Sequence, residues 1–278
     1  MRPPRHWKTA SAAEAAGLIQ PATTVAVGWL SDDLAGAMAE GFFAHGRPDN
    51  LTIVYSSTHG DGRNHGLNLL AHEGLVRRVV GGQWHPVPAL QALANANRIE
   101  AYSLPAGVIN RLFRDVAEGL AGHLSRSGLG TFTDPRNGGG RLNHRTREQL
   151  VRLVHPAGDE ALLFRGFPID AALIGVAFME GTAAIAMTRD SLAIARAART
   201  CGGLVIAQVN RIGTLNKLPP GQVVVPDTLV DVLLEAGPHD RAWETFAPTI
   251  AVGGGPGGRP GGHPGGRLGR RSQRLLTS

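Results

Sequence analysis

The chain has 278 residues, of which 42% are hydrophobic but only 5% aromatic, and its 38 glycines favour an α/β protein with many tight turns over a β-sandwich. One cysteine, Cys201, excludes an internal disulfide and fits a reducing compartment; neither a signal peptide nor an apolar run of membrane-spanning length is evident, so we expect a cytoplasmic protein. The net charge of +6 suggests nucleic-acid binding, but five arginines within residues 249–278 account for it, because the rest of the chain has 23 basic and 22 acidic residues.

The first half of the chain alternates between strand-like and helix-like segments. Ser11, followed three residues later by Glu14, has the capping-box pattern that begins a helix, and Ser31 or Asp32 can cap the next helix. Strands are predicted at 24–28, 51–55, 78–82 and 99–102, and helices at 34–43, 69–77, 87–97 and 108–120. This order predicts an open, mostly parallel sheet with helices on both faces. The polar segment 56–68 follows a strand, at the end of a sheet where ligands bind in such folds.

The second half continues the pattern and then changes in composition. Residues 145–154 have a weak helical period, strands are predicted at 161–164, 171–174, 204–209 and 229–234, and an alanine-rich helix is predicted within 182–200. We place the folded domain at residues 9–248. Glycine, proline and arginine dominate residues 249–278, which cannot bury enough apolar surface to order themselves, so we expect a disordered tail there.

Common catalytic and metal-binding motifs are missing from the sequence. It has no G-x-S-x-G nucleophile elbow, no P-loop and no G-x-G-x-x-G fingerprint. His59, His65 and His72 lie in or next to one loop, but none pairs at the i, i+2 or i, i+4 spacing that directs two imidazoles at one ion, so we expect no metal site. Cys201 has no clear basic neighbour and is interpreted as a structural or incidental thiol.

The most distinctive stretch is a glycine loop in the middle of the chain. Gly128 and Gly130 flank one leucine, Asp134-Pro135 marks a turn, and three glycines follow at 138–140. A tight surface turn is one interpretation; close approach of the backbone to a ligand is the other. The residues by themselves indicate an α/β protein with glycine loops at strand ends, suited to an anionic or pantetheine-like ligand.

Several blocks of the sequence together resemble one known family. Residues 128–143, GLGTFTDPRNGGGRLN, resemble a segment of family I coenzyme A transferases of the acetate/propionate type, in the first, α-subunit-like half of those proteins. Residues 66–76 resemble the family's "GLN..AHEGLVKR" block, 78–84 its "RVIGGHW", 99–109 its "IEAYNLPQGVI" and 167–174 its "FPIDVALI". The similarity runs from about residue 10 to 246, and the order of the blocks makes it specific.

The resemblance implies an enzyme that moves coenzyme A (CoA) between a short-chain acyl-CoA and a free carboxylate, without a cofactor other than the CoA thioester substrate. In the family a glutamate of the enzyme attacks the thioester and forms first an acyl-glutamyl anhydride and then a glutamyl-CoA thioester. Backbone N–H groups of glycine turns supply the oxyanion hole. By this resemblance we expect contacts with substrate and CoA at Gly28, Gly107, Gly128, Gly130 and Thr131.

Two departures from the family pattern bear on this expectation. The family's catalytic glutamate belongs to the second half of the full-length protein, so no glutamate among these 278 residues is assigned that role, and we expect the chain alone to be inactive. The early turn that usually reads GGFG is here Gly28-Trp29-Leu30-Ser31, with only the first glycine kept, which weakens the case for an oxyanion hole at that turn.

Three hypotheses follow from the sequence. In the first, the chain is the first-half domain of a CoA-transferase and works with a second-half, β-type chain or as a homo-oligomer. In the second, it is a non-catalytic binding or scaffold remnant of the same fold. In the third, the arginine-rich tail binds nucleic acid through sequence-independent charge attraction, which the near-neutral body disfavours.

Overall fold

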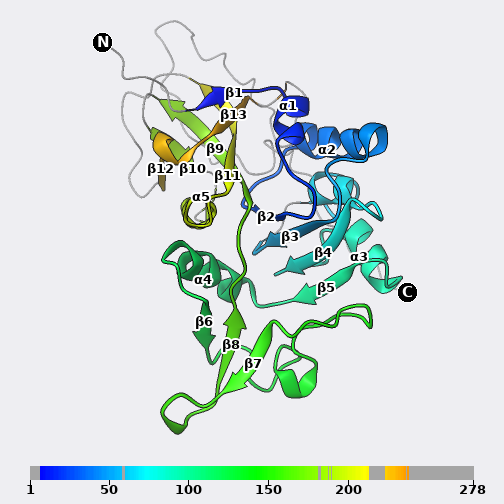
Figure 1. Cartoon of the computed structure of the whole chain (residues 1–278), viewed down its shortest axis with the longest axis vertical. Coiled ribbons are helices and arrows are strands. Elements are labelled where there is room, and N and C mark those ends of the chain that lie inside the picture. Colours follow the sequence, from blue (N-terminus) through cyan, green and yellow to red (C-terminus); the bar gives the residue numbers. More distant parts are fainter. Residues whose placement is uncertain are drawn as a thin grey trace, which may run out of the picture. The chain divides into compact units, whose positions relative to one another are not determined.

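A mostly parallel β-sheet forms the centre of the computed structural model, which describes residues 7–57, 60–180, 183–186, 188, 190–212, 223–235 and 237 (Figure 1). Eight strands form a continuous row in which all neighbours are parallel. In sheet order they are β1 (Lys8–Thr9), β13 (Val232–Glu235), β11 (Leu204–Ile212), β9 (Ala171–Glu180), β2 (Thr24–Val27), β3 (Leu51–Tyr55), β4 (Val76–Gly81) and β5 (Glu100–Ser103). The predicted open parallel sheet is therefore confirmed.

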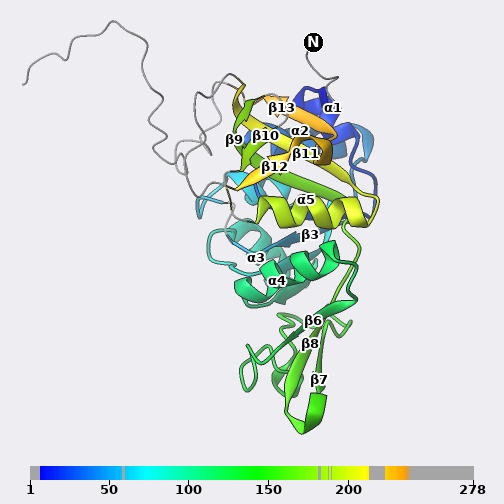
Figure 2. The same ribbon diagram turned by 90° about the vertical axis from the view of Figure 1, so that its left-hand side faces the viewer.

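Helices cover both faces of this sheet, as predicted. Within β2, Val25 packs in the core cluster that contains Met38, whereas its neighbour Ala26 packs in a second cluster with Phe113 and Ile194. Alternate residues of a strand point to opposite faces, so two separate cores form. The helices of the first face are α1 (Ala12–Gly17), α2 (Asp32–His45) and α3 (Pro88–Asn95), and those of the second are α4 (Ala106–Ala117) and α5 (Ser191–Thr200). Figure 2 shows α4 and α5 side by side on the second face.

The predicted helix starts agree with the structure in detail. The Ser11 N–H donates to Glu14 Oε2 at 2.8 Å, and the Glu14 N–H donates back to Ser11 Oγ at 3.3 Å, which completes the capping box of α1. Of the two candidates for the cap of α2, Ser31 holds the position and accepts the Leu34 N–H at 3.2 Å. None of the helices in the described ranges has both the length and the apolar character to cross a membrane.

The strand predicted at 161–164 is confirmed as β8, but several other strands were missed by the sequence patterns. A separate antiparallel sheet, in the order β6-β8-β7, lies beyond β5 and contains β6 (Gly122–Ser125), β8 (Ala161–Arg165) and β7 (Val151–Val154) (Figure 1, green). Along the carboxyl-terminal part of β9, β10 (Ala183–Ala186) pairs antiparallel with that strand and with β12 (Val224–Pro226). The helix predicted at 145–154 is wrong, because β7 pairs with β8 there and pairing outweighs a weak local period.

A second wrong prediction is the helix at 69–77. The chain forms a short 3₁₀ turn and then enters β4, because Gly74 adopts a positive φ of 93°, which ends any regular helix. The 3₁₀ turns of the fold are η1 (Gly66–Leu70), η2 (Pro135–Asn137), η3 (Pro156–Gly158) and η4 (Asp227–Leu229). Residues 249–278, for which the sequence predicts a disordered tail, lie outside the described residues.

Candidate active site

The carboxyl ends of the central strands meet in a tightly packed edge. A side-chain atom added at Gly82, just after β4, would collide with the carbonyl oxygen of Ser56, just after β3. The same atom would lie 3.0 Å from the Cα of Ala106, which begins α4 after β5. Only glycine allows three backbone segments to approach this closely. The segments that follow β3, β4 and β5 therefore form one continuous surface, at the edge where parallel α/β sheets bind ligands.

The beginning of α5 joins this edge from the second face. Ser56 Oγ donates to Asp190 Oδ2 at 2.7 Å, and Asp190 is the N-cap residue of α5. Thr188 Oγ1 donates to the Gly28 carbonyl oxygen at 3.4 Å and lies 2.9 Å from Ser191 Oγ. The ends of β2 and β3 are therefore tied to one helix start, although the residues concerned lie far apart in the sequence.

Gly28 lies where the sequence predicted a strand-end turn, and its surroundings limit what the turn can bind. The N–H groups of Gly28 and Trp29 both donate to the Leu173 carbonyl oxygen, at 2.8 and 3.1 Å. Ser31 N–H donates to Gln208 Oε1 at 2.7 Å, and Gln208 Nε2 donates to the Trp29 carbonyl at 2.8 Å. Three of the four N–H groups in this turn thus have protein acceptors within the described part of the chain, so the turn has little free capacity for an oxyanion.

Gly107 lies at the start of a helix, unlike the other predicted contact residues. It lies in the first turn of α4, is exposed, and has no atom within 4 Å of the position that a side chain would take. The N-cap residue of α4 is Pro105, which provides no side-chain hydrogen bond to the helix start. The first N–H groups of a helix lack intrahelical acceptors and carry partial positive charge. The start of α4 can therefore accept an anionic group such as a carboxylate or phosphate.

The Gly128 loop is held together by its own buried carboxylate. Asp134, shielded from solvent, accepts the Gly130 N–H at 2.9 Å and forms an ion pair with Arg136, in which Nη2 and Oδ2 lie 2.7 Å apart. These bonds to Arg136 and Gly130 hold the pKa of the Asp134 carboxyl well below its usual range. Thr131 Oγ1 donates to the Gly128 carbonyl oxygen at 2.7 Å. The Gly130 N–H and the Thr131 hydroxyl thus bond within the loop.

The five predicted contact residues therefore fall into two groups. Gly28 and Gly107 lie at the carboxyl edge of the sheet, whereas Gly128, Gly130 and Thr131 lie in the loop that follows β6. The far end of that loop reaches the edge, because the Gly140 carbonyl oxygen accepts the Ser103 N–H at 2.8 Å at the end of β5. Gly128 and Gly130 have positive φ of 101° and 72°, so both glycines also have a conformational reason to be present.

Sequence reasoning missed the residues that tie the edge together. Ser56 follows the strand predicted at 51–55, and Gly82 is the last residue of the strand predicted at 78–82, which was the available signal for their place in the fold. Asp190 gave no such signal, because its partner Ser56 is 134 residues away in the sequence. Among the described residues, no three histidine, cysteine, aspartate or glutamate side chains are grouped as a metal site would require, and His59 lies outside those residues.

The fold is that of an α/β domain with helix starts and strand ends gathered at one edge of its sheet. The family model described as coenzyme A transferase matches residues 9–236, and the chain belongs to that family.

Named relatives share about a third of its residues. The chain is 36% identical over 249 residues to a caffeate CoA-transferase of Acetobacterium woodii, which covers 86% of this chain and 47% of that protein. It is 36% identical over 206 residues to the acetate CoA-transferase YdiF of Escherichia coli K12, and the match covers 72% of this chain and 39% of that protein. The chain also superposes on the crystal structure of the acyl-CoA transferase YdiF from E. coli O157:H7, a thioester complex with CoA. The TM-score is 0.77 at 33% identity, and the match covers 85% of this chain and 49% of the YdiF chain. The chain thus spans less than half the length of these curated relatives.

Proposed function

We propose that this chain is the first-half domain of a CoA-transferase that moves CoA between a short-chain acyl-CoA, of the acetate or propionate type, and a free carboxylate. The observation that carries the proposal is family membership over residues 9–236, and the accessible helix start at Gly107 supports it. A second-half chain, equivalent to a β-type subunit, supplies the glutamate nucleophile. This division of labour agrees with the share of the relatives' length that the chain covers.

In the proposed reaction, CoA passes first from the donor acyl group to the glutamate and then from the glutamate to the acceptor carboxylate. The glutamate carboxylate attacks the thioester carbonyl and the carbon–sulfur bond breaks. CoA departs as its thiolate, and an acyl-glutamyl anhydride remains on the enzyme. The thiolate then attacks the glutamyl carbonyl of the anhydride and releases the original acid, which gives a glutamyl-CoA thioester. The acceptor carboxylate then attacks the glutamyl-CoA thioester, which releases CoA thiolate and forms a new anhydride. The thiolate attacks the acceptor's acyl carbonyl in that anhydride, which gives the new acyl-CoA and regenerates the glutamate. In this scheme the present chain contributes the helix start of α4 and the packed strand ends, which orient the anionic groups of the substrates.

The test is reconstitution with a second-half chain of the same family. The 278-residue chain alone should show no CoA transfer, whereas the mixture should move CoA from acetyl-CoA to propionate, because only the mixture contains the nucleophile. Formation of propionyl-CoA, followed by chromatography, measures the activity, and caffeate as an alternative acceptor tests the acyl class. A hydroxylamine-sensitive acyl-glutamyl adduct on the isolated chain would contradict the proposed division. A folded mixture that binds CoA without transferring it would support the scaffold hypothesis.

A substitution at Gly107 tests the helix start directly. Gly107→Val adds bulk where the structure leaves open space, and valine has a somewhat better helix propensity than glycine, so the fold should remain intact with unchanged or slightly higher stability. The added side chain should obstruct an anion that approaches the first turn of α4, and acetyl-CoA binding by the mixture should weaken at least about tenfold, the loss expected for one charge-assisted hydrogen bond. Isothermal titration and thermal unfolding provide the two measurements.

The matched control for that variant is Gly17→Val. Gly17 ends α1, is exposed, and likewise has no atom within 4 Å of the side-chain position. It should leave both stability and binding nearly unchanged. Equal binding by the Gly107 and Gly17 variants would remove Gly107 from the substrate site.

A further inference from the structure

A small cavity of about 220 Å³ lies at the amino ends of β2, β3 and β4, at the opposite end of the sheet from the candidate active site. Its other wall comes from residues just before β7 and at the end of β8. None of the five predicted contact residues lines it. The volume is below the range of about 300–1,000 Å³ found for drug-sized ligands, so the cavity suits a ligand of only a few non-hydrogen atoms.

The sheet side of the cavity is a row of polar side chains in register. Thr24 pairs with Thr52, Thr52 with Arg78, and Arg78 with Glu100, along four neighbouring parallel strands. The next row on the same face, two residues further along each strand, is apolar and belongs to the second core cluster: Ala26, Val54, Val80 and Tyr102. The polar row therefore marks the place where this core ends.

A β-bulge brings a second guanidinium group to this row. Leu51 pairs with Val76, but the next residue, Thr52, pairs with Arg78, so Arg77 is an extra residue of β4. A bulge interrupts the alternation of side chains along a strand and changes their direction. Arg77 Nη2 accordingly donates to Thr52 Oγ1 at 3.0 Å, and both arginines line the cavity.

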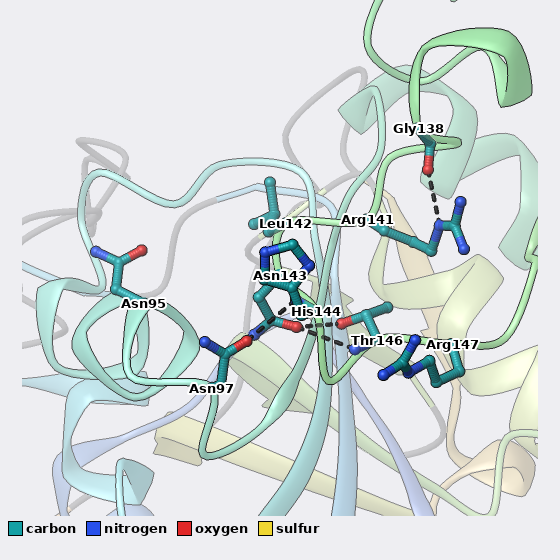
Figure 3. Close-up of a pocket in the computed structure, with 9 residues that line it drawn as sticks. All are labelled: Asn95, Asn97, Gly138, Arg141, Leu142, Asn143, His144, Thr146 and Arg147. Carbon is teal, nitrogen blue, oxygen red and sulfur yellow. Dashed lines mark hydrogen bonds between the residues drawn. The ribbon is translucent and has the colours of Figure 1, made fainter.

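The other wall of the cavity continues from the segment drawn in Figure 3, where Arg141 and Arg147 border a polar groove beside α3. Within that segment, Thr146 Oγ1 accepts a backbone N–H of β5 at 2.8 Å. Two residues later, the Glu148 carbonyl oxygen accepts the Tyr102 hydroxyl at 2.9 Å. The wall is thus fixed on β5 before any ligand arrives, which reduces the entropic cost of binding.

Three guanidinium groups meet two carboxylates around the cavity. Arg78 Nε donates to Glu100 Oε2 at 2.6 Å, and Arg78 Nη1 lies 2.7 Å from Glu148 Oε2. Arg77 Nη1 also donates to Glu100, at 3.3 Å, and Arg165 Nη1 donates to Glu148 Oε1 at 2.8 Å. These five side chains together carry one positive charge more than they neutralise, so the cavity favours an anion.

Hydrogen-bond donors remain after these ion pairs have formed. Within the described part of the chain, Arg165 uses only its Nη1, and the Thr24 hydroxyl makes no hydrogen bond. The Thr52 hydroxyl accepts from Arg77 and keeps its own proton to donate. Asp170 accepts the backbone N–H of Thr24 at 2.7 Å and is not part of the lining. An oxyanion can therefore accept from one guanidinium group and two hydroxyls.

The rest of the lining is largely apolar. Val80 and Leu150 are buried, and Phe167 packs against the second core cluster. An apolar wall next to a group of anion donors suits a carboxylate with a short alkyl chain, because the chain removes this wall from water. Phosphate or sulfate has no apolar part that could do so.

We propose that this cavity binds a short-chain monocarboxylate. Its carboxylate accepts from Arg165 and from the hydroxyls of Thr24 and Thr52, and its alkyl chain lies on Leu150 and Phe167. The bound anion then joins the main sheet to the antiparallel sheet, because these residues come from both. The inference does not depend on the proposed function, since the cavity lies away from the carboxyl edge of the sheet.

The first test measures binding of butyrate to the 278-residue chain alone by isothermal titration. We expect a dissociation constant of about 1 mM, because a ligand of so few atoms makes few contacts. Arg165→Gln should weaken binding about tenfold, and Thr24→Val, which keeps the shape but removes the hydroxyl, about threefold. The Arg165 side chain is 59% exposed and Glu148 keeps its ion pair with Arg78, so the Arg165 variant should fold normally.

Two control variants locate the binding. Arg152→Gln removes the same charge from an exposed residue of β7 that does not line the cavity, and Gly107→Val alters the carboxyl edge. Both should bind butyrate like the wild type. A tenfold loss in the Arg152 variant would indicate net charge, and the same loss in the Gly107 variant would place butyrate at the candidate active site; either result overturns the inference. No binding by the wild type, or unchanged binding by both the Arg165 and Thr24 variants, also overturns it.

Butylamine and inorganic phosphate are the comparison probes. Butylammonium has the same alkyl chain with the opposite charge and should not bind. Phosphate has the charge without the chain and should bind at least about tenfold more weakly than butyrate. If phosphate binds as tightly as butyrate, the cavity is a general anion site and the assignment to a carboxylate is wrong. If butylamine binds as tightly, the arginines do not select the ligand and the inference fails.

Thermal unfolding provides an independent measurement. Butyrate at ten times its dissociation constant should raise the melting temperature of the wild type by about 3–6 °C, since it binds only the folded protein. The same concentration should raise that of Arg165→Gln by about a third as much, because that variant is then only half saturated. Equal shifts in the two proteins would mean that butyrate stabilises the fold elsewhere, which would contradict the assignment.

Discussion

Replacing Gly82 by alanine is expected to destabilise the protein more than any other single methyl addition at the carboxyl edge. The new Cβ would collide with the Ser56 carbonyl oxygen and press on the Cα of Ala106, and both are backbone atoms that cannot rotate away. Overpacking of this kind costs about 3 kcal/mol or more, which for a domain of this size lowers the melting temperature by roughly 6–12 °C. Thermal unfolding followed by circular dichroism measures the change.

The same substitution at Gly107 is the control for that experiment. Gly107 lies one residue after Ala106, at the same edge, but has open space around its side-chain position and lies in a helix, where alanine is favoured over glycine. Gly107→Ala should therefore keep or slightly raise the melting temperature. If the two alanine variants unfold at the same temperature, the three strand ends are not packed as closely as the structure shows.

Asp134→Asn is expected to loosen the glycine loop at neutral pH and to have progressively less effect in acid. The wild-type carboxylate accepts from Gly130 and Arg136 where water does not reach, and the amide cannot replace the charge or accept on both sides. The melting temperature should fall by several degrees at neutral pH. Limited proteolysis should show earlier cleavage within residues 128–140.

The pH dependence follows from the lowered pKa of Asp134. A carboxyl whose pKa is depressed by folding stabilises the native state fully at pH values above its unfolded pKa, here 3.8, and loses that contribution as the pH falls further. The difference in melting temperature between wild type and Asp134→Asn should therefore be constant from about pH 5 to pH 8 and shrink below about pH 4.

Glu40→Gln serves as the control for charge. Glu40 is an exposed residue of α2 for which the described contacts include no ion pair, so removing its charge should change the melting temperature little at any of these pH values. A difference between wild type and Asp134→Asn that stays the same down to pH 2 would mean that the carboxylate charge does not stabilise the loop.

Much of the main sheet could be read from local patterns. Both predicted bounds of the strand at 51–55 agree with β3, and the capping pair Ser11 and Glu14 marked the start of α1 correctly. Caps and buried β-branched runs are local signals. Of the antiparallel sheet, only β8 was predicted, at 161–164. The missed strands β6 and β7 are short and partly exposed, so their apolar residues show little of the alternation that marks a half-buried strand.

The candidate site was predictable only in part. Gly28 ends one predicted strand and Gly107 comes after another, so a ligand edge could be expected near them. The family resemblance selected these two glycines among the 38 of the chain. The roles suggested for Gly128, Gly130 and Thr131 remain predictions, since the structure shows their hydrogen bonds within the loop but no ligand contact.

The sequence by itself determined the family, the parallel α/β class and the strand ends near which we expect a ligand to bind. Those conclusions depend on residues close together in the chain, whose periodicity and turn chemistry act locally. Only the tertiary structure decided that Asp190 meets Ser56, that Gly82 lies against two other backbone segments, and that Arg141 and Arg147 border one groove beside α3. These contacts arise from the strand order and register of the sheet, which bring together residues that no local pattern in the sequence connects.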